Sequence, residues 1–228
     1  MTVEYDDFAE TFGRSRDGLH WPEIDVLLEY FLKHSSQSES WHIADIGCWN
    51  GRLIEHIASK YLEPFVAHQT QYVGIDLSSQ LLAQAQSKEA SGIETQWICG
   101  NMTELGILFA SETFFDAVFL IASFHHLADI EERKQVLKTL WTHLKPEGKI
   151  YITNWNLIHE SQVRYNPSLT KKYEDGSADF TIKIWAHDRF YHAFSEASFL
   201  QLVNDAGYVS EFLDFSGRNS ISILKKQD

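Results

Sequence analysis

Five apolar, β-prone runs alternate with helical patterns between residues 41 and 154, and this alternation restricts the fold more than any other feature of the sequence. Strands that are joined through helical crossovers run parallel to one another, and the crossovers are almost always right-handed. Helices then cover both faces of the sheet, so the chain is expected to form a doubly wound α/β sheet. The expected strands are residues 41–46, 71–75, 95–99, 114–122 and 149–154.

Helical patterns precede the first expected strand and fill the intervals between the later ones. Apolar spacing predicts helices at residues 2–33, where two helices flank a polar loop, at 52–61, at 79–90 and at 195–206. A linker is expected around Pro64. Asp129 precedes a further helix and has Glu132 at capping-box spacing, and the turn at residues 145–148 is expected to close that helix.

The C-terminal part of the chain departs from this alternation. After the last helix, two strand patterns at residues 208–215 and 219–225 are joined only by Ser216-Gly217-Arg218. So short a connection predicts a hairpin, and the last strand must then run antiparallel to its partner. We therefore expect one domain over residues 1–228 with a seven-stranded, mostly parallel sheet. Residues 156–190 are too long for a plain connection, so we expect a functional insertion on the substrate side.

A glycine turn joins the first strand to the next helix within the stretch I-A-D-I-G-C-W-N-G-R-L, residues 43–53. The strand ends at Gly47, and Gly51 opens the helix. A turn of this kind brings bare backbone N–H groups and a helix N-terminus close to a ligand. Asp45 adds a carboxylate at the mouth of the strand. We interpret the stretch as a nucleotide-type cofactor site.

Polar residues follow the next two strands at the edge where a doubly wound sheet binds its ligands. Asp76 ends the second strand and could accept hydrogen bonds from two ribose hydroxyls. Asn101 and Met102 follow the third strand and could pair with and pack on a purine. A purely structural role stays open for each of them, since Asp76 could cap the next helix and Asn101 could start a turn. A nicotinamide enzyme is disfavoured, because the spacing G-x-G-x-x-G is absent.

Bulk properties exclude several classes of protein. The net charge of −13 over 228 residues argues against broad nucleic-acid binding. Residues 159–192 differ from the rest, because they hold five Lys and Arg against five Asp and Glu. No apolar run has membrane-spanning length, and the acidic N-terminus is not a signal peptide. Cys48 and Cys99 fit a reducing compartment, so we expect a cytoplasmic protein with no disulfide and no membrane contact.

The strand-end residues and the terminal hairpin resemble the class I S-adenosylmethionine-dependent methyltransferases, whose pattern is D-x-G-C-G-x-G followed by an acidic residue after the second strand. The resemblance implies S-adenosylmethionine as the cofactor and a Rossmann-like methyltransferase fold. It implies that Asp45, Gly47 and Gly51 line the methionine part and that Asp76 holds the ribose. It implies that Asn101 and Met102 flank the adenine, and that Leu77 and Ile121 also bind the cofactor.

Trp49 stands where that family usually has its middle glycine. A tryptophan would be strained there if the position needs a positive φ. A side chain that points at the ligand would narrow the pocket. We favour a third interpretation, in which the ring packs against the N-terminal helices.

Three ordered motifs resemble a narrower family, the tRNA wobble-uridine methyltransferases that esterify carboxymethyluridine. They are F-x-x-S-R ending at Arg16, A-S-F-H-H-L at residues 122–127 and R-F-Y-H-A-F at residues 189–194. This resemblance implies that Arg16 approaches the cofactor carboxylate. It also implies that His125, Arg189 and His192 face the methyl acceptor.

The chemical nature of the methyl acceptor decides which of these side chains takes part in the reaction. Methyl transfer from a sulfonium is an in-line displacement, so the enzyme mainly positions the acceptor and excludes water. A carboxylate needs no general base, and Arg189 could orient it bidentately. A hydroxyl or an amine would need a base, and His125 or His192 could serve.

Three functions follow as alternatives. The first is methylation of a carboxymethyl group on a tRNA wobble uridine. The second is methylation of a small carboxylate, phenol or quinone precursor, which the net charge favours. The third is a non-catalytic S-adenosylmethionine-binding subunit, which Trp49 favours. A small activator subunit, as in eukaryotic members of the resembled family, is a further candidate partner. No metal is expected, because the adjacent side chains of His125 and His126 diverge and no cysteine lies at zinc-ligand spacing.

Overall fold

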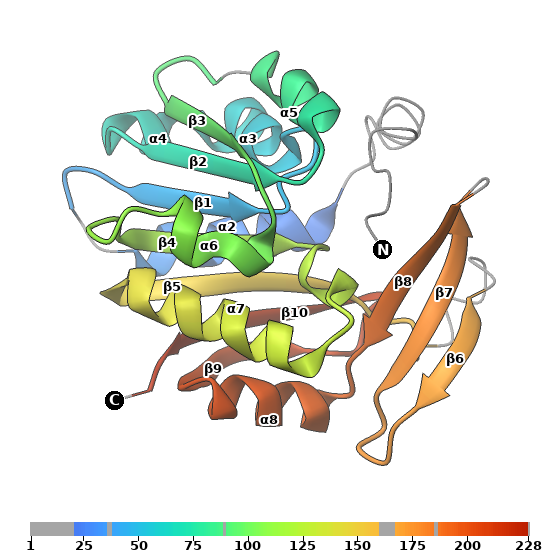
Figure 1. Ribbon diagram of the computed structural model, residues 1–228. Helices are drawn as coiled ribbons and strands as arrows, with labels where there is room; N and C mark the ends of the chain where they lie inside the picture. Colours follow the sequence, from blue (N-terminus) through green and yellow to red (C-terminus); the bar gives the residue numbers. More distant parts are fainter. Residues whose placement is uncertain (1–20, 36–37, 89, 160–166, 185–186, 228) are drawn as a thin grey trace.

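The computed structural model describes residues 21–35, 38–88, 90–159, 167–184 and 187–227, and this part of the chain contains a seven-stranded sheet between two layers of helices (Figure 1). The strand order is β3-β2-β1-β4-β5-β10-β9. The pairings among β1 to β5 are parallel, whereas β10 is antiparallel to both β5 and β9, which confirms the predicted fold class. The strands are β1 His42–Ile46, β2 Gln71–Asp76, β3 Glu94–Cys99, β4 Phe115–Ile121, β5 Leu144–Trp155, β9 Tyr208–Asp214 and β10 Asn219–Lys226.

The helices follow the predicted order along the chain. They are α2 Pro22–His34, α3 Arg52–His56, α4 Leu62–Ala67, α5 Ser79–Gln86, α6 Leu105–Leu108, α7 Ile130–His143 and α8 Glu196–Asp205. The second helix predicted within residues 2–33 is confirmed as α2, and the first lies outside the described residues. Asp129 caps α7 as predicted, since its side chain accepts hydrogen bonds from the N–H groups of Glu131 and Glu132. Ser78 caps α5, which ends at Gln86 rather than at the predicted Ala90.

The linker predicted around Pro64 is wrong. A π-helical turn, Ile57–Tyr61, follows α3, and α4 begins anew after Tyr61, whose φ of −127° is not helical, so Pro64 lies in the first turn of α4. A proline is tolerated there because the N–H groups of a first helical turn have no partner within the helix.

The turn predicted at residues 145–148 is also corrected. β5 begins at Leu144, directly after α7. Phe115 of β4 pairs with Leu144, and Ala117 pairs with Lys149, so the residues between Leu144 and Lys149 form a bulge within the strand. The Pro-Glu-Gly sequence therefore interrupts the ladder without ending the strand, as expected for proline and glycine at a bulge.

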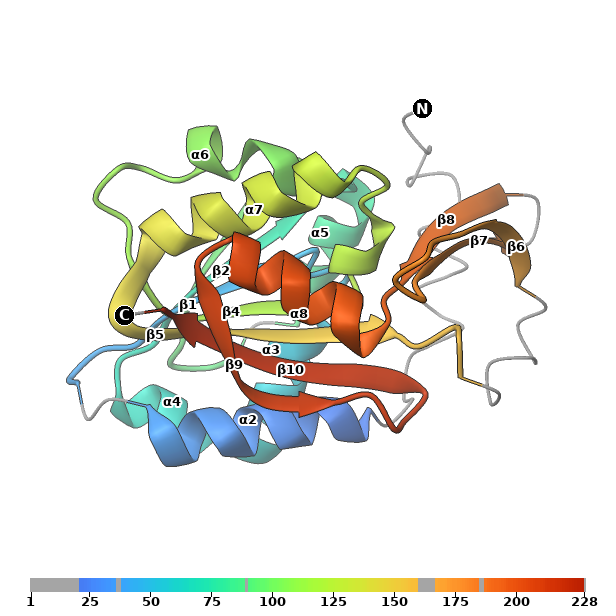
Figure 2. The ribbon, with the colours of Figure 1, turned by 90° about the horizontal axis from the view of Figure 1, so that it is seen from below.

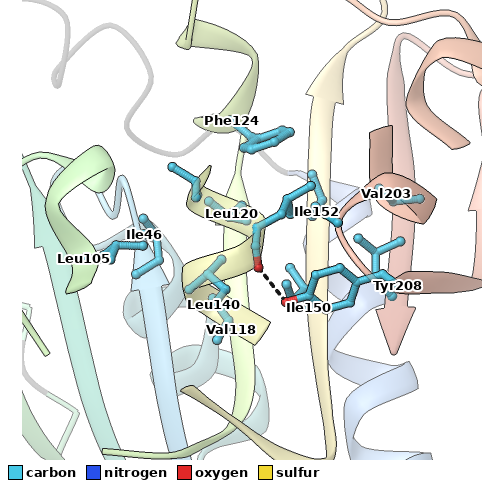
Figure 3. Packing of buried hydrophobic residues seen from close by; sticks show 14 of the residues in the cluster. Ile46, Leu105, Val118, Leu120, Phe124, Leu140, Ile150, Ile152, Val203 and Tyr208 are labelled. Carbon is cyan, nitrogen blue, oxygen red and sulfur yellow. Dashed lines mark hydrogen bonds between the residues drawn. The ribbon is translucent and has the colours of Figure 1, made fainter. Parts of the chain in front are cut away.

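Two hydrophobic layers hold the helices on the sheet, because alternate strand residues point to opposite faces. Val118 and Leu120 of β4 pack with Leu140 of α7 and Val203 of α8 (Figure 3). Phe119, between them in the chain, faces the layer that contains α2. Figure 2 shows α7 and α8 on one side of the sheet and α2 on the other. This packing fixes the carboxyl ends of β1, β2 and β4 along one edge.

The segment expected to be irregular at residues 156–190 instead contains most of a second sheet. Its strands are β6 Ser168–Lys172, β7 Ala178–Ile184 and β8 His187–Ala193, and both pairings are antiparallel. Trp155, at the end of β5, is buried with Ile182 and Tyr191 of this small sheet. Figures 1 and 2 place the small sheet beyond the carboxyl end of β5, and its strand β8 carries Arg189 and His192. No helix in the described ranges is long and apolar enough to cross a membrane.

Candidate active site

The glycine turn after β1 packs directly against the loop that follows β4. The N–H groups of Gly47 and Cys48 both donate to the carbonyl of Ile75, at 2.8 and 2.9 Å. Gly47 has a φ of 73°, and a Cβ on it would lie 2.4 Å from the Cβ of Ser123. No other residue fits there. Ser123, which the sequence did not single out, donates from its hydroxyl to the carbonyl of Ile46 at 2.6 Å and holds the two loops together.

Asp45 is a buried carboxyl group at the mouth of β1. Its side chain is 1% exposed, and the Tyr72 hydroxyl donates to its Oδ2 at 2.5 Å. Its Oδ1 has no hydrogen-bond partner in the described part of the chain. Burial is the main cause that raises the pKa of Asp45 from 3.8 to about 7, and the charge of Asp76 raises it further. A donor or cationic group of a ligand would satisfy this oxygen.

Asp76 ties the glycine turn to the start of α5. Its Oδ2 accepts from the N–H of Trp49 at 2.8 Å, and its Oδ1 accepts from the N–H of Ser78 at 3.0 Å. Burial raises its pKa, while these N–H donors and the charge of Arg189 oppose the increase. Each carboxylate oxygen has a second lone pair, so the structural role of Asp76 leaves it able to accept ribose hydroxyls.

The other residues predicted to bind the cofactor follow the ends of β2, β3 and β4 at the same edge. Asn101 starts a 3₁₀ turn, with its Oδ1 accepting from the N–H of Thr103 at 3.1 Å, so the structural role left open for it is present. The Met102 Cε lies 3.6 Å from the point where a Cβ on Gly47 would stand. Leu77 is 45% exposed, and Ile121 ends β4. Arg16 lies outside the described residues, so its predicted contact stays a prediction.

Trp49 has a φ of 54°, so the strain considered for this position is present. The Arg52 guanidinium carbon lies 4.6 Å from the centre of the Trp49 ring and 4.3 Å from the centre of the Trp21 ring. Since Trp21 precedes α2 directly, the Trp49 ring is linked through Arg52 to the start of that helix.

His125 is fully buried beneath the small sheet. The N–H of Trp155 donates to its Nδ1 at 3.3 Å, so the neutral ring carries its hydrogen on Nε2. The ring stacks on Tyr191, with ring centres 5.3 Å apart. Burial is the main cause that lowers the pKa of His125 to about 3, and the charge of Arg189 adds to it. The ring is therefore neutral and weakly basic throughout the physiological pH range.

Arg189 and His192 lie on opposite faces of β8, because they are three positions apart and successive residues of a strand point to alternate faces. Arg189 shares its face with Tyr191, whose ring centre lies 5.8 Å from its guanidinium carbon. His192 faces the other way, where its Nδ1 lies 2.6 Å from the Asp179 Oδ1, and burial lowers its pKa. The charge of Arg189 acts on both Asp76 and His125, and His192 also acts on His125, but Arg189 and His192 do not share a face of β8. The catalytic roles of all three stay predictions.

Two features of this edge fit the amino acid and nucleoside parts of S-adenosylmethionine. The Asp45 Oδ1 has no hydrogen-bond partner among the described residues, and the turn at Gly47 has no room for a Cβ. Asp45, Gly47 and Gly51 would hold the methionine part, and Asp76 the ribose. Metal binding has no comparable support, since the described residues contain no group of three or more His, Cys, Asp and Glu placed to hold an ion. Cys48 and Cys99 are free thiols.

Comparisons with known proteins agree with this geometry. Residues 43–148 match a family model described as a methyltransferase domain. The chain is 26% identical, over 90% of its length, to a protein of Encephalitozoon cuniculi described as a methyltransferase, and the match covers 84% of that protein. It is 28% identical, over 77% of its length, to the tRNA (carboxymethyluridine(34)-5-O)-methyltransferase of Arabidopsis thaliana, but spans only 36% of that protein.

The fold also has a counterpart among solved structures. An S-adenosylmethionine-dependent methyltransferase from Clostridium acetobutylicum superposes with a TM-score of 0.69. The superposition covers 98% of this chain and 99% of the other, at 16% sequence identity. The two chains therefore share one fold.

Proposed function

Because this chain is a class I S-adenosylmethionine-dependent methyltransferase, we propose that it esterifies a carboxylate, namely the carboxymethyl group of a tRNA wobble uridine. S-adenosylmethionine supplies an electrophilic methyl group on a sulfonium. The residues of the chain orient the acceptor in line with that methyl group and exclude water. Since the chain is an enzyme, the alternative of a non-catalytic subunit is not retained.

The low pKa and the occupied Nδ1 of His125 are the observations on which the choice of a carboxylate as the methyl acceptor rests. A hydroxyl or an amine must lose a proton to become a methylated product, which calls for a base with a pKa near the working pH. His125 has a pKa of about 3, and its Nδ1 already accepts from Trp155. His192 lies on the face of β8 opposite to Arg189, and burial lowers its pKa. A carboxylate is ionised at neutral pH and needs neither histidine as a base.

Arg189 supplies the cation that a carboxylate acceptor requires. It lies on the face of β8 that carries Tyr191, and its charge acts on both Asp76 and His125. A guanidinium donates two parallel N–H groups to a carboxylate, which fixes the orientation as well as the position of the acceptor. The effect of its charge on both a predicted cofactor residue and His125 supports this role.

The tRNA part of the proposal rests on the three motifs and on the Arabidopsis relative, whose name states that reaction. The net charge of −13 favours a second candidate, in which the same site methylates a small carboxylate. Both candidates use Arg189 in the same way, and they differ in what surrounds the reacting group.

Mass spectrometry of nucleosides tests the proposal. tRNA from a strain that lacks this protein is incubated with the enzyme and isotope-labelled S-adenosylmethionine, then digested to nucleosides. We expect a labelled methyl ester on the wobble uridine, and less label in tRNA from the wild-type strain, where the site is already filled. Equal labelling of the two tRNA pools would contradict the tRNA assignment. Label that resists mild alkaline hydrolysis would contradict a methyl ester.

A further inference from the structure

The cofactor turn contains a bulky residue in a conformation that favours glycine. Gly47 and Gly51 have φ values of 73° and 78°, and Trp49 between them has a φ of 54°. A left-handed conformation is unfavourable for a tryptophan and persists only where the surroundings enforce it. The N–H of Trp49 donates to the Asp76 Oδ2 at 2.8 Å, so this conformation directly positions the predicted ribose acceptor.

The Trp49 ring is held by a cation between two indoles. The Arg52 guanidinium carbon lies 4.6 Å from the centre of the Trp49 ring and 4.3 Å from that of Trp21. Trp21 is itself 9% exposed and packs in the hydrophobic layer with Leu53. A guanidinium is planar and weakly hydrated, and it is attracted to the faces of both rings. The anchored Trp21 therefore fixes Arg52, and Arg52 fixes the ring of Trp49.

We propose that Trp21 and Arg52 are positioning residues for the cofactor, which clamp Trp49 so that the turn keeps the left-handed conformation it needs. The clamp replaces the conformational freedom of the glycine that the family has at this position. It also keeps the indole next to Arg52, which in turn contacts Trp21 at the start of α2. This role adds Trp21 and Arg52 to the cofactor residues predicted from the sequence, and it does not depend on which acceptor the enzyme uses.

Arg52 could influence the cofactor in another way, which the test must separate. Its positive charge lowers the pKa of the buried Asp45 carboxyl group, against the larger effect of burial. Removal of Arg52 would therefore change both the clamp and the charge near Asp45. Trp21 carries no charge, so a change at Trp21 disturbs the clamp and leaves the charge in place.

Calorimetric titration with S-adenosylhomocysteine measures the effect on the cofactor site without an acceptor. Arg52→Met should raise the Kd by about tenfold, or about 1.4 kcal/mol. Arg52→Lys, which keeps a cation between the rings, should recover most of the affinity. Trp21→Leu should weaken binding to a similar extent as Arg52→Met. If Trp21→Leu does not fold, Trp21→Phe keeps a smaller ring and should show a partial loss.

A double-mutant cycle with Trp49→Gly gives the decisive readout. Glycine adopts a positive φ without a clamp, so Trp49→Gly alone should leave the Kd within about twofold of the wild-type value. In that background Arg52→Met should also change the Kd by less than about twofold. A merely structural loss of stability would persist in both backgrounds, and thermal unfolding of each variant measures that loss separately.

A matched control is available at the other end of the sheet. The Lys226 Nζ lies 4.4 Å from the centre of the Trp141 ring, so Lys226→Met removes a similar cation–aromatic contact that is remote from the turn. It should leave the Kd unchanged. Wild-type affinity in Trp21→Leu would overturn the proposal. The same tenfold loss for Arg52→Met with and without Trp49→Gly would overturn it too, because Arg52 would then act through its charge.

Discussion

Asp45 combines burial, one strong hydrogen bond and one oxygen without a partner among the described residues. The groups that act on it are Tyr72, Asp76 and Arg52, and burial outweighs them, so its pKa rises to about 7. A carboxyl group with a raised pKa makes the ligand-free protein less stable when it ionises. The same ionised group would bind a cationic part of the cofactor. The stability of the ligand-free protein thus favours the protonated form of Asp45, whereas cofactor binding favours the ionised form.

Asp45→Asn should therefore change the pH dependence of stability. Between the ordinary pKa of 3.8 and the folded pKa of about 7, the folded wild type keeps a proton that the unfolded chain has lost. This contribution to stability is complete below the lower value and is lost as the pH rises through the upper one. The free energy of unfolding of the wild type should fall relative to the variant by up to about 1.4 kcal/mol per pH unit in this interval.

Urea denaturation at several pH values measures this difference. In parallel, the affinity of the wild type for S-adenosylmethionine should rise toward about pH 8, because an ionised carboxylate favours the cofactor ammonium group. The affinity of Asp45→Asn should be weaker and nearly flat with pH. Parallel stability profiles for the two proteins would show that Asp45 does not titrate with a raised pKa.

Arg189→Lys separates bidentate orientation from charge at the acceptor side. Lysine keeps the positive charge that acts on Asp76, but it cannot offer two parallel N–H groups to a carboxylate. We expect kcat/KM for the acceptor to fall by at least about tenfold, with the Kd for S-adenosylmethionine within about twofold. Steady-state kinetics and calorimetry measure the two quantities. An equal loss of cofactor affinity would instead assign Arg189 to the cofactor.

At the scale of elements, the strands of the small sheet are held to one another by a polar network centred on Asp179. The Asp179 Oδ1 lies 2.6 Å from the His192 Nδ1, and the Tyr173 hydroxyl donates to the Asp179 Oδ2 at 2.7 Å. The charge of Asp179 also acts on Arg133, which is buried on α7. The Arg133 guanidinium carbon lies 5.4 Å from the centre of the Phe194 ring, directly after β8, so this end of the small sheet lies next to α7.

Asp179→Ala should loosen the small sheet without disturbing the cofactor edge. It leaves the buried His192 ring and the Tyr173 hydroxyl without this acceptor, which should cost about 2 to 3 kcal/mol. Hydrogen exchange should show faster exchange in β7 and β8 and unchanged protection in β1. Asp188→Ala is the matched control, because Asp188 is exposed on the same sheet opposite Lys183 and should cost less than about 0.5 kcal/mol. Equal effects of the two substitutions would contradict a structural role for the network.

The sequence predicted the large sheet well and the small sheet not at all, for a physical reason. The parallel strands are apolar runs between helices, and Ser216-Gly217-Arg218 is too short for anything but a hairpin. β6 is exposed along its whole length and ends in two lysines, so it carries no apolar pattern. Its neighbours β7 and β8 gain their order from contact with Trp155, which is distant in the chain. Tertiary contacts of this kind override local propensity.

Some residues of the candidate site could be predicted from the sequence, and others could not. Gly47 and Asp76 could be predicted because their chemistry is tied to strand ends. Tyr72 and Ser123 could not, since their bonds to Asp45 and to the Ile46 carbonyl depend on how the neighbouring strands and loops are aligned. The position of Arg189 and His192 on opposite faces follows from β8 being a strand, which the sequence did not predict.

At the scale of the whole molecule, the distribution of charge bears on the acceptor. The chain carries −13 overall, but the small sheet includes Lys171, Lys172 and Lys183 together with Arg189. An acidic protein repels tRNA, so binding would have to concentrate on this part of the surface. A small carboxylate needs no such surface, which makes the salt dependence of the reaction informative.

Kinetics at increasing salt should distinguish the two acceptors. Phosphate contacts make nucleic-acid affinity fall steeply with salt, so KM for tRNA should rise by more than about tenfold from about 50 to about 200 mM salt. Cofactor affinity should change by less than about twofold, because a buried pocket is screened little. Lys172→Ala and Lys183→Ala should each reduce the slope of log KM against log salt by about one. Lys225→Ala is the control, since Lys225 lies opposite Lys149 at the other end of β10 and should leave the slope unchanged. A KM for tRNA that does not respond to salt would favour a small carboxylate as the acceptor.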